Sequence, residues 1–143
     1  MKTTENDILL AEDDSDEVEI FETALKELKV NYELRSAMDG VVLFKLLSER
    51  TPDVLFLDHH MPCKNGIECL LEIRKESAYD EMPIIMYSSQ TLPFAIEGAY
   101  KHGANRFLPK PETFNDLVEK MGMIFQKPWK DYLSTPSLQN FKL

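Results

Sequence analysis

The most constraining feature of the sequence is a set of four short apolar runs that alternate with helical patterns. The runs cover residues 8–11, 54–57, 84–87 and 106–109, and each is followed by acidic residues, hydroxyls or a lysine. Runs of this length between helical patterns are typical of buried parallel strands. In an open parallel sheet, ligands bind beyond the carboxyl ends of the strands, where the strand order reverses. We therefore expect the residues after these runs to share one crevice.

Amphipathic segments separate the runs. Asp14 or Ser15 can cap a first helix, with Glu17 placed as in a capping box, and Asp39 is expected to open a second helix. Residues 31–36 alternate polar and apolar side chains, which predicts an edge strand with one face in water. Three later segments repeat apolar residues at helical spacing. Five β-α units in strict alternation, with right-handed crossovers, predict an α/β fold: a doubly wound, five-stranded parallel sheet in a three-layer sandwich.

Length and composition limit the functional class. The chain has 143 residues, 43% of them hydrophobic, which suits one buried core. Its net charge of -9 disfavours nucleic acid as a partner, because phosphate backbones are bound through clustered positive charge. No apolar stretch approaches a membrane span and residues 1–7 are mostly polar, so we expect a soluble, cytoplasmic protein without a membrane partner. Cys63 and Cys69 fit neither a disulfide scaffold nor a paired zinc motif, and we expect them to be small buried or half-buried side chains.

Asp58 is the first candidate for chemistry. A carboxylate can attack phosphorus and hold the transferred group as an acyl phosphate. Glu12 and Asp13 follow the first run, and together with Asp58 they favour a hard divalent cation such as magnesium. The plainer alternative for this acidic cluster is a helix N-cap, a role that suits Asp14. Two more carboxylates at the end of a buried strand would repel one another without a cation.

Lys110 and Ser88 are the next candidates. Lys110 lies between two prolines after the last run, and its compact ammonium suits a phosphoryl oxygen, although a lone lysine commonly extends into water. Ser88 and Ser89, taken alone, are more typical of a turn. At the end of a strand next to Asp58, one of these hydroxyls is placed to donate a hydrogen bond to the phosphate.

In this order, the motifs resemble the receiver domains of two-component response regulators over about residues 7–126. The matching positions are Glu12-Asp13, Asp58, Met61-Pro62 with Gly66, Ser88 and Lys110-Pro111. The resemblance implies the flavodoxin-like strand order 2-1-3-4-5. It also implies that Asp58 accepts a phosphoryl group from a histidine kinase or a histidine phosphotransfer protein.

The resemblance implies a metal site as well. Magnesium is expected to be held by Asp13, Asp58 and the backbone carbonyl of His60, with Glu12 assisting through water. His60 and Gln90 are expected to line the crevice, and we hypothesise that His60 alters the lifetime of the phosphoryl group.

The same resemblance assigns a switch. Ser88 matches the hydroxyl that moves toward the phosphoryl group, and Phe107 matches the aromatic residue that turns inward with it, although Phe107 reads equally well as a core residue. Lys110 matches the lysine that contacts the phosphate. The Lys110-Pro111 peptide bond is expected to be cis, a geometry that only proline tolerates at low cost.

Other interpretations fit less well. A zinc site at His59, His60 and Cys63 would have too few ligands. Phosphatases of the haloacid dehalogenase type place a second aspartate two residues after the first, where this chain has His60. A flavodoxin-like FMN carrier would need an uncharged phosphate loop in place of Glu12 and the residues after it. A phosphorylation-independent receiver-like binding module remains the main alternative.

The sequence thus predicts a stand-alone response regulator, which switches protein contacts and is not a turnover enzyme. Residues 127–143 are expected to form an extension without an output domain. Its Trp129 and Tyr132 fit a loosely held tail, a fold-back onto the last helix or a partner contact. The cognate kinase, the downstream target and homodimerisation are left open.

Overall fold

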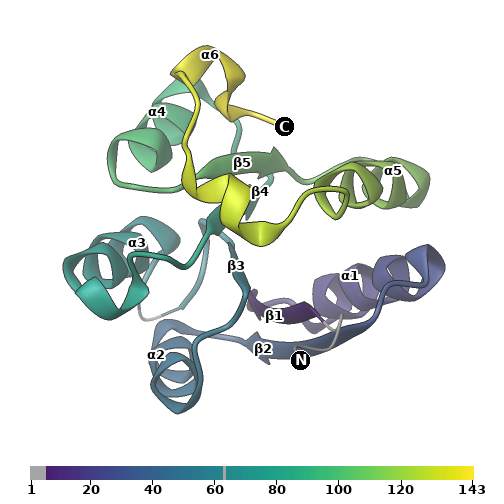
Figure 1. Cartoon of the computed structure of the whole chain (residues 1–143), viewed down its shortest axis with the longest axis horizontal. Coiled ribbons are helices and arrows are strands. Elements are labelled where there is room, and N and C mark those ends of the chain that lie inside the picture. The colour runs from purple at the N-terminus through teal and green to yellow at the C-terminus, as the bar shows by residue number, and fades with distance from the viewer. Residues whose placement is uncertain (1–5, 63) are drawn as a thin grey trace.

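Five parallel strands form one sheet in the order β2-β1-β3-β4-β5, with helices on both faces (Figure 1). The structure is a computed structural model that describes residues 6–62 and 64–143. The strands are β1 (Asn6–Ala11), β2 (Tyr32–Ala37), β3 (Val54–Leu57), β4 (Ile84–Ser88) and β5 (Arg106–Pro109). Every pairing between neighbouring strands is parallel. The predicted doubly wound fold and its strand order are therefore confirmed.

The helices divide between the two faces of the sheet (Figure 1). One face carries α1 (Ser15–Leu28) and α5 (Phe114–Ile124), and the other carries α2 (Gly40–Glu49), α3 (Gly66–Lys75) and α4 (Pro93–Lys101). The shorter helical segments are η1 (Ser77–Tyr79), η2 (Trp129–Leu133) and α6 (Leu138–Phe141). Among the described residues, no helix is long and apolar enough to cross a membrane.

Burial on both faces explains the continuous apolar runs. In β1, Ile8 and Leu10 pack in the core beneath α1 and α5, whereas Leu9 and Ala11 pack in the core beneath α2, α3 and α4. Successive side chains of a strand point to opposite faces, so a central strand needs apolar residues at every position. Strand β2 lies at an edge and has mixed burial, which agrees with its alternating sequence.

The helix caps match the sequence in part. Asp39 caps α2 by accepting a hydrogen bond from the N–H of Val42 at 2.9 Å, as expected. Asp14 caps α1, but its carboxylate accepts from the N–H of Asp16 at 2.9 Å. The predicted capping box with Glu17 is wrong, because a bond to the second helical residue replaces the bond to the third.

The C-terminal segment, residues 127–143, folds back onto the domain. Trp129 donates its indole N–H to the side-chain oxygen of Asn6 at 2.9 Å, and the Tyr132 hydroxyl donates to the carbonyl of Ile124 at 2.7 Å. The segment then crosses from the α5 side past β5 to α4 (Figure 1). Of the three interpretations of this tail, the structure shows the fold-back.

Candidate functional site

Three carboxylates meet where β1 and β3 end. Oxygen atoms of Glu12, Asp13 and Asp58 all lie within 4.8 Å of one another, a group that could hold a metal ion. The backbone N–H of Asp58 donates to the carbonyl of Ala11 at 3.0 Å, which places the two strand ends side by side. Glu12 and Asp58 are only 2% and 4% exposed, whereas Asp13 is exposed. The structure therefore brings together the acidic residues that the sequence singled out.

Lys110 reaches into this cluster from the end of β5. Its ammonium donates to Glu12 Oε1 at 2.6 Å and to Asp58 Oδ2 at 3.4 Å, and it lies 5.5 Å from the centre of the Tyr87 ring. Burial by itself would lower the pKa of Lys110, but the hydrogen bond to Glu12 and the charges of Asp58 and Glu12 outweigh it and raise that pKa. The alternative in which this lysine extends into water is therefore excluded.

Glu12 is held in an unusual state for a carboxylate. Burial raises the pKa of Glu12 to about 7, and the neighbouring charge of Asp58 adds to the rise, while the hydrogen bond from Lys110 opposes it. We attribute the direction to burial, because the side chain is almost completely removed from water. Three carboxylates face one ammonium here, and this excess of negative charge suits a hard divalent cation with oxygen ligands.

The start of α3 approaches the backbone of Asp58 very closely. The N–H of Gly66 donates to the carbonyl of His59 at 2.9 Å, and a Cβ at Gly66 would lie 2.2 Å from the Asp58 carbonyl oxygen. Only glycine fits this approach, which explains its place in the motif. Asn65 and Glu68 close a capping box at the same helix end. The Asn-x-x-Glu pattern of this box is visible in the sequence, but the box was not predicted from it.

Ser88 lies at the end of β4, fully buried. Its hydroxyl oxygen accepts the N–H of Gln90 at 3.0 Å, and its carbonyl accepts the N–H of Lys110 at 2.9 Å. Phe107 lies on β5, opposite Met86 of β4, and is fully buried in the core beneath α2, α3 and α4. The structure thus connects Ser88 to the lysine through the backbone and places Phe107 in the core.

His59, His60 and Cys69 differ in their exposure and in their contacts. His60 is exposed, and its backbone N–H donates to Asp58 Oδ1 at 3.4 Å. Among the described residues, the group that could hold a metal ion consists of Glu12, Asp13 and Asp58. Burial lowers the pKa of His59 and His60 adds to the fall, while the charge of Asp58 opposes it. Cys63 lies outside the described residues, and Cys69 is buried as expected.

The expected cis bond before Pro111 is wrong. No peptide bond among residues 6–62 and 64–143 is cis, so the Lys110-Pro111 bond is trans. A trans bond before proline is favoured by about 0.5–1 kcal/mol, and in this geometry the Lys110 ammonium already reaches both carboxylates.

A polar network that was not predicted from the sequence joins β4 to β5. The Asn105 side-chain oxygen accepts the N–H of Ile84 at 2.8 Å and a guanidinium N–H of Arg74 at 2.9 Å. Arg74 also donates to the carbonyls of Gly103, Tyr79 and Met82. The only signal in the sequence was a polar pair, Asn105-Arg106, next to a short apolar run. The network holds together β4, which ends at Ser88, and β5, which Lys110 follows.

Comparisons with known proteins find similar chemotaxis proteins. The chain is similar to the chemotaxis protein CheY-3 of Vibrio cholerae serotype O1, with 29% identity over 120 residues that cover 84% of this chain and 92% of the Vibrio protein. It is similar to a CheY homologue of Campylobacter jejuni, with 32% identity over 115 residues that cover 80% and 88% of the two chains.

A solved structure extends the likeness to the tail region. The Mn(2+)-bound form of the response regulator Rcp1 matches with a TM-score of 0.78 and 23% identity, over 92% of this chain and 99% of Rcp1. This likeness supports the fold. The profile of the response regulator receiver domain matches residues 8–122, which is most of the chain. The chain therefore belongs to the response regulator receiver domain family.

Proposed function

We propose that this protein is a phosphorylation-dependent switch of a two-component phosphorelay, in which Asp58 accepts a phosphoryl group from a histidine kinase or a histidine phosphotransfer protein. The observation that carries the proposal is the convergence of Asp58, Glu12, Asp13 and Lys110 at the carboxyl ends of three parallel strands. Membership of the receiver family supports phosphoacceptor signalling in general. The source of the phosphoryl group and the existence of a downstream protein that reads the phosphorylated state are both part of the proposal.

Asp58 is suited to act as the nucleophile. Its carboxyl group is buried and fixed by the backbone N–H of His60 and by the Lys110 ammonium. One carboxyl oxygen would form the new bond to phosphorus while the donor's phosphoramidate nitrogen leaves. Lys110, already within 3.4 Å of Asp58, would then contact an oxygen of the transferred group.

Glu12, Asp13 and Asp58 would hold a magnesium ion, with the His60 carbonyl as a further proposed ligand. The fit rests on two almost fully buried carboxylates, Glu12 and Asp58, whose charge Lys110 compensates in part. When bound, the ion would neutralise the charge of the incoming phosphoryl group. The chain's own residues would orient the acceptor and exclude water. The protein would act, as receivers in general do, as a switch that assists its own phosphoryl chemistry.

Ser88 and Phe107 are the proposed switch residues. A dianionic group on Asp58 offers the Ser88 hydroxyl a stronger acceptor than it has in the unmodified protein, and only such a difference in contacts can shift an equilibrium. The Lys110 ammonium would be attracted to the same phosphoryl group, and the Lys110 backbone N–H donates a hydrogen bond to the Ser88 carbonyl. We assign the receiver unit to residues 7–126, with residues 127–143 as an extension packed against it.

The test is intact-mass spectrometry after incubation with a small phosphodonor and magnesium. The wild-type chain should gain the mass of one phosphoryl group, and a chelator should abolish the gain. Asp58→Asn should show no gain, whereas Asp116→Asn, a change of an exposed carboxylate on α5, should behave as wild type. A wild-type chain that gains no mass would refute the proposal and favour the phosphorylation-independent binding module.

A further inference from the structure

The C-terminal segment is held in two unequal parts. We call residues 129–135 the clamp, because several hydrogen bonds fix them. Arg106 donates to the carbonyls of Tyr132 and Ser134 at 3.4 and 3.3 Å, and the Asn105 side-chain amide donates to the Thr135 hydroxyl at 3.0 Å. The bonds of Trp129 to β1 and of Tyr132 to α5 add to these. The clamp is thus tied to β1, β5 and α5 at once.

Residues 136–143, which we call the latch, have fewer contacts. Most of the four-residue helix α6 is exposed, and Phe141 is its only buried residue. The Phe141 ring lies 5.1 Å from the ring of Tyr100 on α4 and 6.5 Å from that of Phe107 on β5. Lys142 then pairs in parallel with Phe107, and the N–H of Leu143 donates to the Phe107 carbonyl at 2.8 Å. One aromatic anchor and one strand contact therefore hold the latch.

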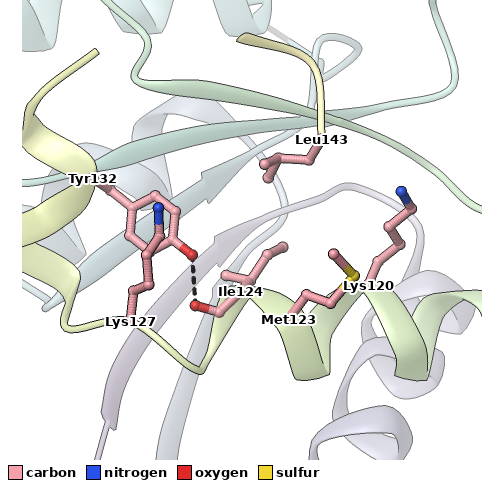
Figure 2. A pocket seen from close by; sticks show the side chains of 6 residues that line it. All are labelled: Lys120, Met123, Ile124, Lys127, Tyr132 and Leu143. Carbon is pink, nitrogen blue, oxygen red and sulfur yellow. Dashed lines mark hydrogen bonds between the residues drawn. The ribbon is translucent and has the colours of Figure 1, made fainter. Parts of the chain in front are cut away.

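The latch extends the sheet beyond β5. Phe141 packs in the core on the α4 side, and Leu143, two residues later, packs against the core on the α5 side. The α5 side is incompletely filled, because Leu143 overhangs a cavity of about 190 Å³ lined by Met123, Ile124 and Tyr132 together with two lysines (Figure 2). The latch is therefore well packed on one face of the sheet and loosely packed on the other.

Strand β5 connects the latch to the phosphorylation site. Its residue Phe107 contacts the latch through both its ring and its carbonyl. Lys110, three residues further along, contacts Asp58 and is bonded to Ser88 through its backbone. Because β5 has only four residues, a shift of Lys110 and Ser88 toward a new phosphoryl group acts on the strand that holds Phe141 and Leu143.

We propose that the latch is closed over β5 while Asp58 is unmodified and opens when Asp58 is phosphorylated. The proposal rests on the proposed function. Opening exposes the backbone groups of the β5 edge and the aromatic seat formed by Tyr100 and Phe107. An exposed strand edge is completed by another extended segment, so the surface fits a partner segment that carries an aromatic residue and, two positions later, an aliphatic one.

Hydrogen exchange of the full chain, followed by mass spectrometry, tests this idea. The wild-type chain is compared with and without a small phosphodonor and magnesium, and intact mass reports phosphorylation in the same samples. Exchange of the latch amides should rise about tenfold on phosphorylation, within the usual range of couplings between two sites. The clamp amides should not change, and Asp58→Asn should show no response.

The outcomes separate the two proposals. A gain of phosphoryl mass with unchanged latch exchange overturns the latch and leaves the proposed function standing. No gain of mass overturns the proposed function and the latch with it. Phe141→Ala should exchange rapidly at the latch in both states, whereas Leu138→Ala, on the exposed side of α6, should respond as wild type. A Phe141→Ala chain with normal circular dichroism and a wild-type response would also overturn the latch.

Discussion

Replacement of Gly66 by alanine tests how closely α3 must approach the phosphoacceptor. The added Cβ would lie 2.2 Å from the Asp58 carbonyl oxygen, whereas ordinary contact begins at 3.4 Å, so backbone must move by the difference, 1.2 Å. A second clash, 2.9 Å from the His59 Cα, also involves backbone, which cannot rotate away as a flexible side chain does. The displaced atoms belong to the residue proposed to take the phosphoryl group.

Overpacking of this kind costs about 1–3 kcal/mol. For a chain of this size we expect the melting temperature to fall by roughly 3–9 °C. A misplacement of about 1 Å at a reacting group can lower a rate about a hundredfold, so phosphoryl uptake should fall much more than the loss of stability explains. The assays are thermal unfolding by circular dichroism and intact mass during incubation with a phosphodonor, below the melting temperature of both proteins.

Gly98 provides a matched control. It lies inside α4, and a Cβ there would meet nothing within 4 Å. Alanine is favoured over glycine in a helix interior by about 0.5–1 kcal/mol, so Gly98→Ala should raise the melting temperature slightly and leave uptake unchanged. A Gly66→Ala chain with wild-type melting and wild-type uptake would show that the close approach does not matter.

Three further predictions follow from the site and its supports. Magnesium at a hundred times its dissociation constant should stabilise the wild-type chain by about 2.7 kcal/mol in thermal unfolding, and Asp13→Asn should reduce this shift; equal shifts in both chains would exclude Asp13 as a ligand. Asn105→Ala leaves the N–H of Ile84 without its side-chain acceptor and should cost about 1–3 kcal/mol in urea unfolding, so an unchanged midpoint would contradict the network. Burial raises the pKa of Tyr87, so above about pH 10 the unfolded chain loses a proton that the folded chain keeps, and the free energy of unfolding falls as pH rises. Tyr87→Phe should weaken this fall in urea titrations from pH 8 to 11; a pH profile identical to that of the wild-type chain would rule out Tyr87 as the cause.

The sheet and its acidic cluster were predictable because they depend on short-range patterns. A strand buried on both faces must be apolar throughout, and parallel strands bring their carboxyl ends to one edge, so Asp58 and Lys110 had to lie near each other. The meeting of Glu12 with Lys110, ninety-eight residues apart, follows from the same topology. The motif at Gly66 was visible, but its reason, the contact with the Asp58 carbonyl, appears only in three dimensions.

The tail was not predictable in the same way. Its position depends on long-range bonds between side chains and backbone, such as that of Arg106 to Ser134, which leave no periodic pattern in the sequence. Trp129 and Tyr132 were noticed as aromatic residues, but their partners on β1 and α5 were not. The trans bond before Pro111 and the cap bond that the Asp16 N–H donates to Asp14 show a similar limit, because two local geometries of nearly equal energy are decided by their surroundings.

The clamp has a practical consequence for anyone who shortens this chain or joins it to another protein. The family profile ends at residue 122, yet the Trp129 ring lies 6.5 Å from that of Phe56 in the central strand and 5.0 Å from that of Phe125. A fragment cut at the profile boundary would leave these aromatic surfaces bare and would be prone to precipitate. Expression fragments should therefore include the clamp, and they should include the latch as well wherever Phe141 is to stay buried in the core.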